Sequence, residues 1–232
     1  METYAGLGRR RVGALRISAA VVGVPLLVAA IAIGARSLRG VVSPSAGRAA
    51  SVKLTGEATW PAGARPAPPI AALHDQRGQP FSLGALRGRT VAMVFFDSHC
   101  RQECPLAGRA LAGAERSLPP AQRPVLVVVS VNPLDTAAST RAAARSWGLS
   151  GLAPWHWLRG THSELARVWR AYRIYVQPER GDIAHTEALY LIDRRGDERS
   201  GFLYPYLPDR VTHDLRVLAG AGDRTRAGGG RA

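Results

Sequence analysis

Two uncharged apolar runs predict the centre of a β-sheet. Val91–Phe96 and Val125–Val131 are rich in Val, Phe and Leu and have the length of strands. Such runs are typical of strands that are buried on both faces. Because both faces are apolar, helices must cover the sheet on each side.

Two antiparallel hairpins are predicted around this centre. Residues 187–192 and 201–206 read as strands on either side of a turn at Asp193–Gly196. Residues 73–83, with Arg77-Gly78 in the middle, predict a second hairpin ahead of the first apolar run.

Four helices are predicted from their capping and stop signals. They begin at Pro105, at Asp135 or Thr136, at the capping box of Thr161 with Glu164, and at Asp209. The resulting order is β-hairpin, β, α, β, α, α, β, β, α. This order predicts the α/β class, with a mixed β-sheet flanked by helices.

An uncharged stretch near the N-terminus predicts a transmembrane anchor at residues 17–35. As a helix it would be roughly 28 Å long at ~1.5 Å per residue, close to the hydrocarbon thickness of a membrane. Four arginines precede it, which predicts a cytoplasmic N-terminus (residues 1–16) and an extracytoplasmic remainder. The alternative is a cleaved signal peptide, although the run exceeds the usual apolar core of ~7–15 residues. Both interpretations export the rest of the chain.

The remaining chain divides by composition. Residues 36–69 are rich in Ala, Gly, Pro and Ser and predict an extended linker, in which Val52 and Leu54 are candidates for a short edge strand. Residues 70–220 form the predicted domain. Residues 221–232, which contain Gly228-Gly229-Gly230, predict a disordered tail.

Composition narrows the function classes. A hydrophobic content of 46% permits a buried core, and two cysteines exclude a disulfide-rich scaffold. The formal net charge is +14, but half of it lies in the first 67 residues, where the leading arginines orient the membrane segment. The domain has no basic cluster with interleaved aromatic residues, which argues against a nucleic-acid partner.

The two cysteines lie together where chemistry is expected. Cys100 and Cys104 follow the first apolar strand, at the edge where open α/β sheets carry their sites. Two residues four apart on a helical turn face the same way, and their Cα atoms lie about 6 Å apart, within reach of a disulfide. N–H groups at the start of the helix favour a thiolate. The pair predicts either a redox-active dithiol and disulfide or a site for one soft metal ion, with a purely structural disulfide as the alternative.

A histidine is the expected third ligand, because thiolates suit Cu(I) and an imidazole allows the same site to hold Cu(II). The chain has six histidines: His74, His99, His156, His162, His185 and His213. His185 follows the polar segment 177–184, which predicts a loop that folds over the cysteines. A polar surface residue is the alternative for His185. Structural zinc is less favoured, since two cysteines and one histidine leave a tetrahedral site one ligand short.

At this point the chain resembles the Sco/SenC family of membrane-anchored, thioredoxin-like copper proteins over about residues 70–219. The matching stretches are Gln79-Pro80-Phe81-Ser82-Leu83 with Leu86-Arg87-Gly88, Val94-Phe95-Phe96, His99-Cys100-x-x-x-Cys104-Pro105, Val129-Ser130-Val131-Asn132-Pro133, and Asp182-Ile183-Ala184-His185-Thr186 running into Tyr190-Leu191-Ile192-Asp193. Asp97 departs from the family, which usually has an aromatic residue there.

The resemblance implies that Cys100, Cys104 and His185 bind copper, as Cu(I) or Cu(II), and that the cysteines can also work as a redox pair. Family members deliver copper to the binuclear copper centre of cytochrome c oxidase or reduce its oxidised cysteine thiols. The expected function is therefore that of a metallochaperone, whose partner is an oxidase subunit or another copper or thiol protein.

The alternative function is a membrane-tethered thiol–disulfide oxidoreductase that uses Cys100 and Cys104 as its catalytic pair. Ordinary enzymes of that kind have two residues between the cysteines and a cis-proline before the third core strand. This chain has three intervening residues, and His185-Thr186-Glu187 stands before that strand. Both observations favour metal binding.

Overall fold

The computed structural model describes residues 53–152 and 154–228, with side chains described up to residue 220. Six strands form one sheet in the order β1-β8-β7-β2-β3-β4. Their bounds are β1 (Ala58–Thr59), β2 (Val91–Phe96), β3 (Val125–Ser130), β4 (Trp155–Leu158), β7 (Ala188–Ile192) and β8 (Glu198–Leu203).

The two apolar runs form the middle of this sheet, as predicted. Every residue of β2 and β3 is buried, and the two strands pair in parallel with Val91 opposite Val125. β7 pairs with the other side of β2 in the antiparallel direction. The sheet is therefore mixed, and with its flanking helices it has a thioredoxin-like fold.

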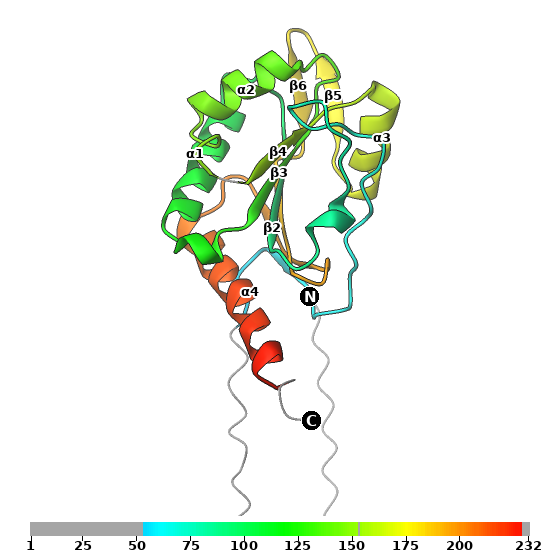
Figure 1. Cartoon of the computed structure of the whole chain (residues 1–232). Coiled ribbons are helices and arrows are strands. Elements are labelled where there is room, and N and C mark those ends of the chain that lie inside the picture. The colour runs from blue at the N-terminus through cyan, green and yellow to red at the C-terminus, as the bar shows by residue number, and fades with distance from the viewer. Residues whose placement is uncertain (1–52, 153, 229–232) are drawn as a thin grey trace, which may run out of the picture. The chain divides into compact units, whose positions relative to one another are not determined.

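Helices cover both faces of the sheet (Figure 1). The helices are α1 (Glu103–Arg116), α2 (Ala137–Ser146), α3 (His162–Ala171) and α4 (Pro208–Gly228). α1, α2 and α4 share one apolar core with one face of the sheet, whereas α3 packs into a second core on the opposite face. This arrangement places the start of α1 at the carboxyl end of β2.

The capping signals predicted at Thr136 and Thr161 are present, whereas Asp209 lies inside the first turn of α4, which begins at Pro208, and is not its cap. The hydroxyl of Thr161 accepts a hydrogen bond from the Glu164 N–H, and the Glu164 carboxylate accepts one from the Thr161 N–H at 2.8 Å. Thr136 caps α2 in the same way, with Ser139 as its partner. These caps satisfy N–H groups that a helix start leaves without partners.

The linker prediction is wrong for residues 53–69, because this segment packs on the domain. β1 pairs with β8 at the edge of the sheet, four residues beyond the candidate edge strand at Leu54. The N–H groups of Thr55 and Gly56 donate to the buried carboxylate of Asp214. Backbone and buried polar groups hold the segment, so its sequence shows no apolar periodicity.

The predicted hairpin over residues 73–83 is reduced to a single bridge. His74 pairs with Pro80 across a turn, and it also pairs with Arg159 on the other side. The segment then enters a short 3-10 helix at Leu83–Leu86. Hydrogen bonds from the Phe81 N–H to the Leu73 oxygen and from the Asp75 N–H to the Gln79 oxygen flank this pair, and the 3-10 helix that follows ends the ladder.

Strands stand where the sequence predicted irregular chain. β4 extends the sheet beside β3, and a separate two-stranded sheet consists of β5 (Val176–Glu179) and β6 (Asp182–His185). The loop predicted for residues 177–184 is therefore a hairpin. β5 is largely exposed and β6 is largely half-buried, and neither shows the alternation of apolar and polar residues that signals a strand.

The described residues include the start of the predicted C-terminal tail but not the predicted N-terminal membrane segment. α4 continues to Gly228, so the tail predicted to be disordered from residue 221 begins as helix. The predicted membrane segment at residues 17–35 lies outside the described residues. Within residues 53–152 and 154–228, no helix combines the length and the apolar character that a membrane crossing requires.

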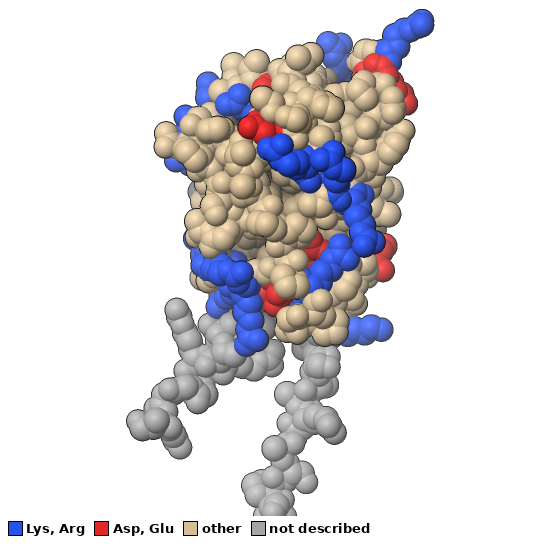
Figure 2. Space-filling model, turned by 90° about the vertical axis from the view of Figure 1, so that its right-hand side faces the viewer, with Lys and Arg blue, Asp and Glu red and all other residues tan. Residues whose placement is uncertain are grey.

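Basic side chains gather on the face that α3 covers (Figure 2). Arg167 and Arg170 are exposed on this helix, and Arg173 is exposed just after it. Acidic side chains are interspersed on the same face. The surface charge is thus mixed.

Candidate metal centre

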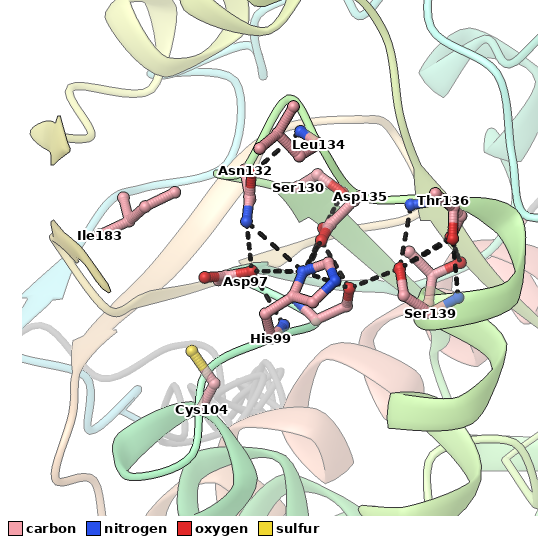
Figure 3. Close-up of polar contacts among 12 residues, drawn as sticks. Asp97, His99, Cys104, Ser130, Asn132, Leu134, Asp135, Thr136, Ser139 and Ile183 are labelled. Carbon is pink, nitrogen blue, oxygen red and sulfur yellow. Dashed lines mark hydrogen bonds and ion pairs between the residues drawn. The ribbon is translucent and has the colours of Figure 1, made fainter. Parts of the chain in front are cut away.

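Three chain segments meet at the carboxyl end of β2. The loop after Phe96 carries Cys100, the first turn of α1 carries Cys104, and the end of β6 carries His185. Figure 3 shows Cys104 at the start of α1, beside the loop that carries Asp97 and His99. The sequence predicted that a loop before His185 would fold over the cysteines. In the structure the β5–β6 hairpin takes the place of that loop and brings His185 to Cys104.

The cysteines form a pair of free thiols with very different acidities. A hydrogen bond from the Cys104 side chain lowers the pKa of Cys100 to about 6, with help from N–H groups at the start of α1. The same hydrogen bond and burial raise the pKa of Cys104. Near pH 7, the pair therefore holds one proton on Cys104 and a thiolate on Cys100.

His185 faces Cys104 with its Nε2 atom, which lies 3.5 Å from the Cys104 Sγ. Its Nδ1 lies 3.3 Å from the backbone oxygen of Thr186, which can only accept a hydrogen bond. Nδ1 therefore carries the proton, and the lone pair of Nε2 points toward the sulfur. Burial lowers the pKa of His185, which keeps the ring neutral and able to bind a metal.

A third group, Glu187, belongs to the same cluster. Its Oε1 lies 3.9 Å from the His185 Nε2, and donor atoms of Cys104, His185 and Glu187 all lie within 4.8 Å of one another. Burial raises the pKa of Glu187 to about 7. Sequence reasoning missed this residue, although the spacing His-x-Glu in an extended segment places both side chains on one side.

A second cluster braces the loop that carries Cys100 (Figure 3). The buried carboxylates of Asp97 and Asp135 both lie near Nδ1 of His99, at 3.4 and 3.2 Å. Asp97 accepts hydrogen bonds from the His99 N–H and from Asn132, and Asp135 accepts them from Ser98 and Ser130. These oxygens already have partners in the protein, so the cluster serves to hold the loop.

The other histidines have structural contacts. His156 packs against Phe81 and lies 3.4 Å from the carboxylate of Asp75. His99 points into the aspartate cluster rather than toward Cys104, and it lies in a turn that the Cys100 N–H to Asp97 O hydrogen bond closes, not in the extended segment that the sequence predicted. Of the predicted site residues, Cys104 thus contacts both Cys100 and His185.

The donor set fits a soft or borderline metal ion. Two thiols and one neutral imidazole are ligands that copper and zinc accept. The 3.5 Å between the Cys104 sulfur and the His185 nitrogen equals the spacing of about 3.5 Å expected for tetrahedral ligands with bonds of about 2.3 and 2.0 Å. Backbone N–H groups around Cys100 stabilise the thiolate form that a metal needs.

The mixed sheet and the cysteine pair at the start of α1 define a thioredoxin-like protein with a thiol site. The family model for SCO1/SenC matches residues 71–220, which is more than half of the chain. The chain belongs to the SCO1/SenC family. A comparison with curated proteins found no match.

Solved structures of the family are similar to this chain. The Bradyrhizobium japonicum ScoI, solved with copper bound, is 27% identical, with a TM-score of 0.53 over 66% of this chain and 98% of that one. BsSco, described as a member of the Sco family of cytochrome c oxidase assembly proteins with a disulfide switch, is 20% identical over 67% and 94%, with a TM-score of 0.58. A SCO1/SenC lipoprotein from Bacillus anthracis is 22% identical over 67% and 95%, also with a TM-score of 0.58.

Proposed function

We propose that the protein binds copper outside the cytoplasm and acts as a metallochaperone in the assembly of a cytochrome c oxidase copper centre. The observation that carries this proposal is the approach of His185 Nε2 to within 3.5 Å of Cys104 Sγ, beside the hydrogen-bonded thiol pair. Membership of the SCO1/SenC family and the copper-bound ScoI structure support it.

In this proposal Cys100, Cys104 and His185 hold one copper ion as cargo. Cys100 is already a thiolate near pH 7, and the proton on Cys104 leaves when the metal binds. The neutral His185 ring offers Nε2 without first losing a proton. Two thiolates suffice for Cu(I), whereas the imidazole adds affinity for Cu(II).

The proposed location follows from the N-terminal sequence. Residues 17–35 would anchor the protein with residues 1–16 in the cytoplasm, residues 36–52 as a tether and the copper site outside. A cleaved form would be released on the same side of the membrane. The lipoprotein description of the Bacillus anthracis relative supports attachment to a membrane.

A second function is favoured by the low pKa of Cys100. A thiolate at pH 7 next to a resolving thiol is the starting state of a thiol–disulfide oxidoreductase. The residue before β7 is Glu187 rather than a proline, which argues against an ordinary thioredoxin-type enzyme. Reduction of a client's disulfide to two thiols, with Cys100 and Cys104 becoming a disulfide, is therefore the second candidate.

Anaerobic copper titration separates the two functions. Cu(I) and Cu(II) are titrated against competing chelators for the wild type, Cys100→Ser and His185→Ala. His162→Ala is the matched control because His162 is exposed on α3. Insulin reduction by the same proteins is measured in parallel.

We expect one copper per wild-type chain, a clearly lower copper affinity in Cys100→Ser, and no change in His162→Ala. Wild-type protein that binds no copper but turns over insulin would establish the oxidoreductase instead. An unchanged copper affinity in Cys100→Ser would remove this residue from the site.

A further inference from the structure

The carboxylate of Glu187 is buried beside the thiol site without a full set of partners. Its side chain is 10% exposed, and Oε2 has no hydrogen-bond partner among the described residues. Leaving such an atom without a partner is costly in a protein interior. A buried carboxylate persists in this setting where a cation or a proton compensates its charge.

The charged groups around Glu187 add negative charge. The Cys104 side chain is hydrogen-bonded to the carboxylate, and the charges that act on it, those of Cys100 and Glu103, are both negative. Its Oε1 lies 3.9 Å from Nε2 of His185, which burial keeps neutral. The groups that face the carboxylate are thus the metal donors themselves and another acid.

Glu187 also supplies the donor that the predicted site lacks. Two cysteines and one histidine leave a tetrahedral ion one ligand short. Donor atoms of Glu187, His185 and Cys104 lie within 4.8 Å of one another, and Cys100 is hydrogen-bonded to Cys104. The four side chains offer two sulfurs, one nitrogen and one oxygen.

We propose that Glu187 is a fourth metal ligand of the Cys100, Cys104 and His185 site and makes it favour divalent over monovalent copper. Carboxylate is a hard ligand and suits Cu(II), whereas two thiolates alone satisfy the soft Cu(I) ion. The added negative charge also favours the ion of higher charge. This inference rests on the proposed copper-binding function.

The test compares both valences in the full chain. Cu(II) affinity is measured by chelator competition, with the absorption and electron paramagnetic resonance spectra of the bound ion, and Cu(I) affinity is measured anaerobically. Glu187→Gln keeps the shape of the side chain and removes its charge. Glu103→Gln is the matched control, because it removes an exposed negative charge at the same end of α1.

We expect Glu187→Gln to lower Cu(II) affinity by at least about tenfold and to change both spectra. Its Cu(I) affinity should stay within about threefold of the wild type. Glu103→Gln should leave both affinities and the spectra unchanged.

Several outcomes would overturn the inference. Wild-type Cu(II) affinity and spectra in Glu187→Gln would exclude Glu187 as a ligand, and equal losses for both valences would indicate a structural role. A loss of Cu(II) affinity in Glu103→Gln equal to that in Glu187→Gln would show that the effect comes from negative charge near the site and not from a bond between Glu187 and the metal. In each case the wild type still binds copper, so the proposed function stands; a wild type that binds neither valence overturns both.

A variant that fails to fold is replaced by Glu187→Asp, which keeps the charge but shortens the side chain. Weaker Cu(II) binding with unchanged Cu(I) binding in this variant supports the inference. Unchanged binding of both ions overturns it.

Discussion

Removing the Cys104 thiol should make Cys100 a much weaker acid. The hydrogen bond from Cys104 is the largest cause of the low pKa of Cys100, about 6. At that pKa, about 90% of Cys100 is thiolate at pH 7, against about 3% at the usual pKa of ~8.5. In Cys104→Ala the N–H groups at the start of α1 remain, so we expect a pKa above 7 but below 8.5.

The assay is the rate of alkylation of Cys100 by iodoacetamide between pH 4 and pH 10, in the presence of a metal chelator. The midpoint of the profile reports the pKa. The rate at a single pH does not, because a more basic thiolate is intrinsically more nucleophilic and offsets the smaller thiolate fraction. Cys104→Ser is the matched control, since its hydroxyl can still donate to Cys100.

We predict that the alkylation rate of Cys100 has its midpoint near pH 6 in the wild type, at a similar pH in Cys104→Ser and at a clearly higher pH in Cys104→Ala. Equal midpoints in the two variants would show that the hydrogen bond does not set the acidity of Cys100. A wild-type midpoint above 8 would show that the thiolate is not the resting form.

Three further predictions concern stability and metal binding. Burial raises the pKa of Glu115 to about 8, so its ionisation costs stability progressively as the pH rises from about 4.5 to about 8. Glu115→Gln should therefore raise the free energy of unfolding by roughly 3 kcal/mol at pH 7 and by almost nothing at pH 4. A difference in unfolding free energy between the two proteins that stays constant across this pH range would refute this. His185→Ala should weaken Cu(II) much more than Cu(I) in chelator competition, since two thiolates suffice for the soft ion, and an equal loss would argue against a ligand role. Thr161→Ala removes the cap of α3 and should lower the unfolding free energy by about 1 kcal/mol in urea titrations, whereas the exposed control Arg167→Ala should change it by less than about 0.5 kcal/mol.

The parts of the fold that could be predicted are those whose residues interact locally or are buried on both faces. β2 has the predicted bounds Val91–Phe96, because nothing polar interrupts it. The cap at Thr161 could be read because both of its partners lie within one turn. These signals need no knowledge of the tertiary structure.

The missed parts depend on contacts between distant segments. The segment around Thr55 looks like a linker, and its fixed position results from hydrogen bonds to Asp214 on α4. β4 contains Trp155 and His156 in its half-buried part, and Trp157 is fixed by hydrogen bonds to Gln76 and Ser130. No local pattern reports such partners.

The candidate site likewise contains residues that the sequence predicted and one that it did not. The cysteine spacing predicted a pair at the start of a helix, and the position of His185 predicted a chain segment that reaches the pair. Glu187 was missed, because a lone glutamate at the start of an apolar strand reads as a surface residue until its burial beside Cys104 is seen.

X-ray absorption spectroscopy of the copper-loaded protein tests the central claim most directly, because it identifies the atoms bound to the metal. We predict two sulfur neighbours and an imidazole nitrogen in the wild type, one sulfur in Cys100→Ser, and loss of the imidazole signal in His185→Ala. A copper ion without sulfur neighbours, or a spectrum that is identical in all three proteins, would contradict the account.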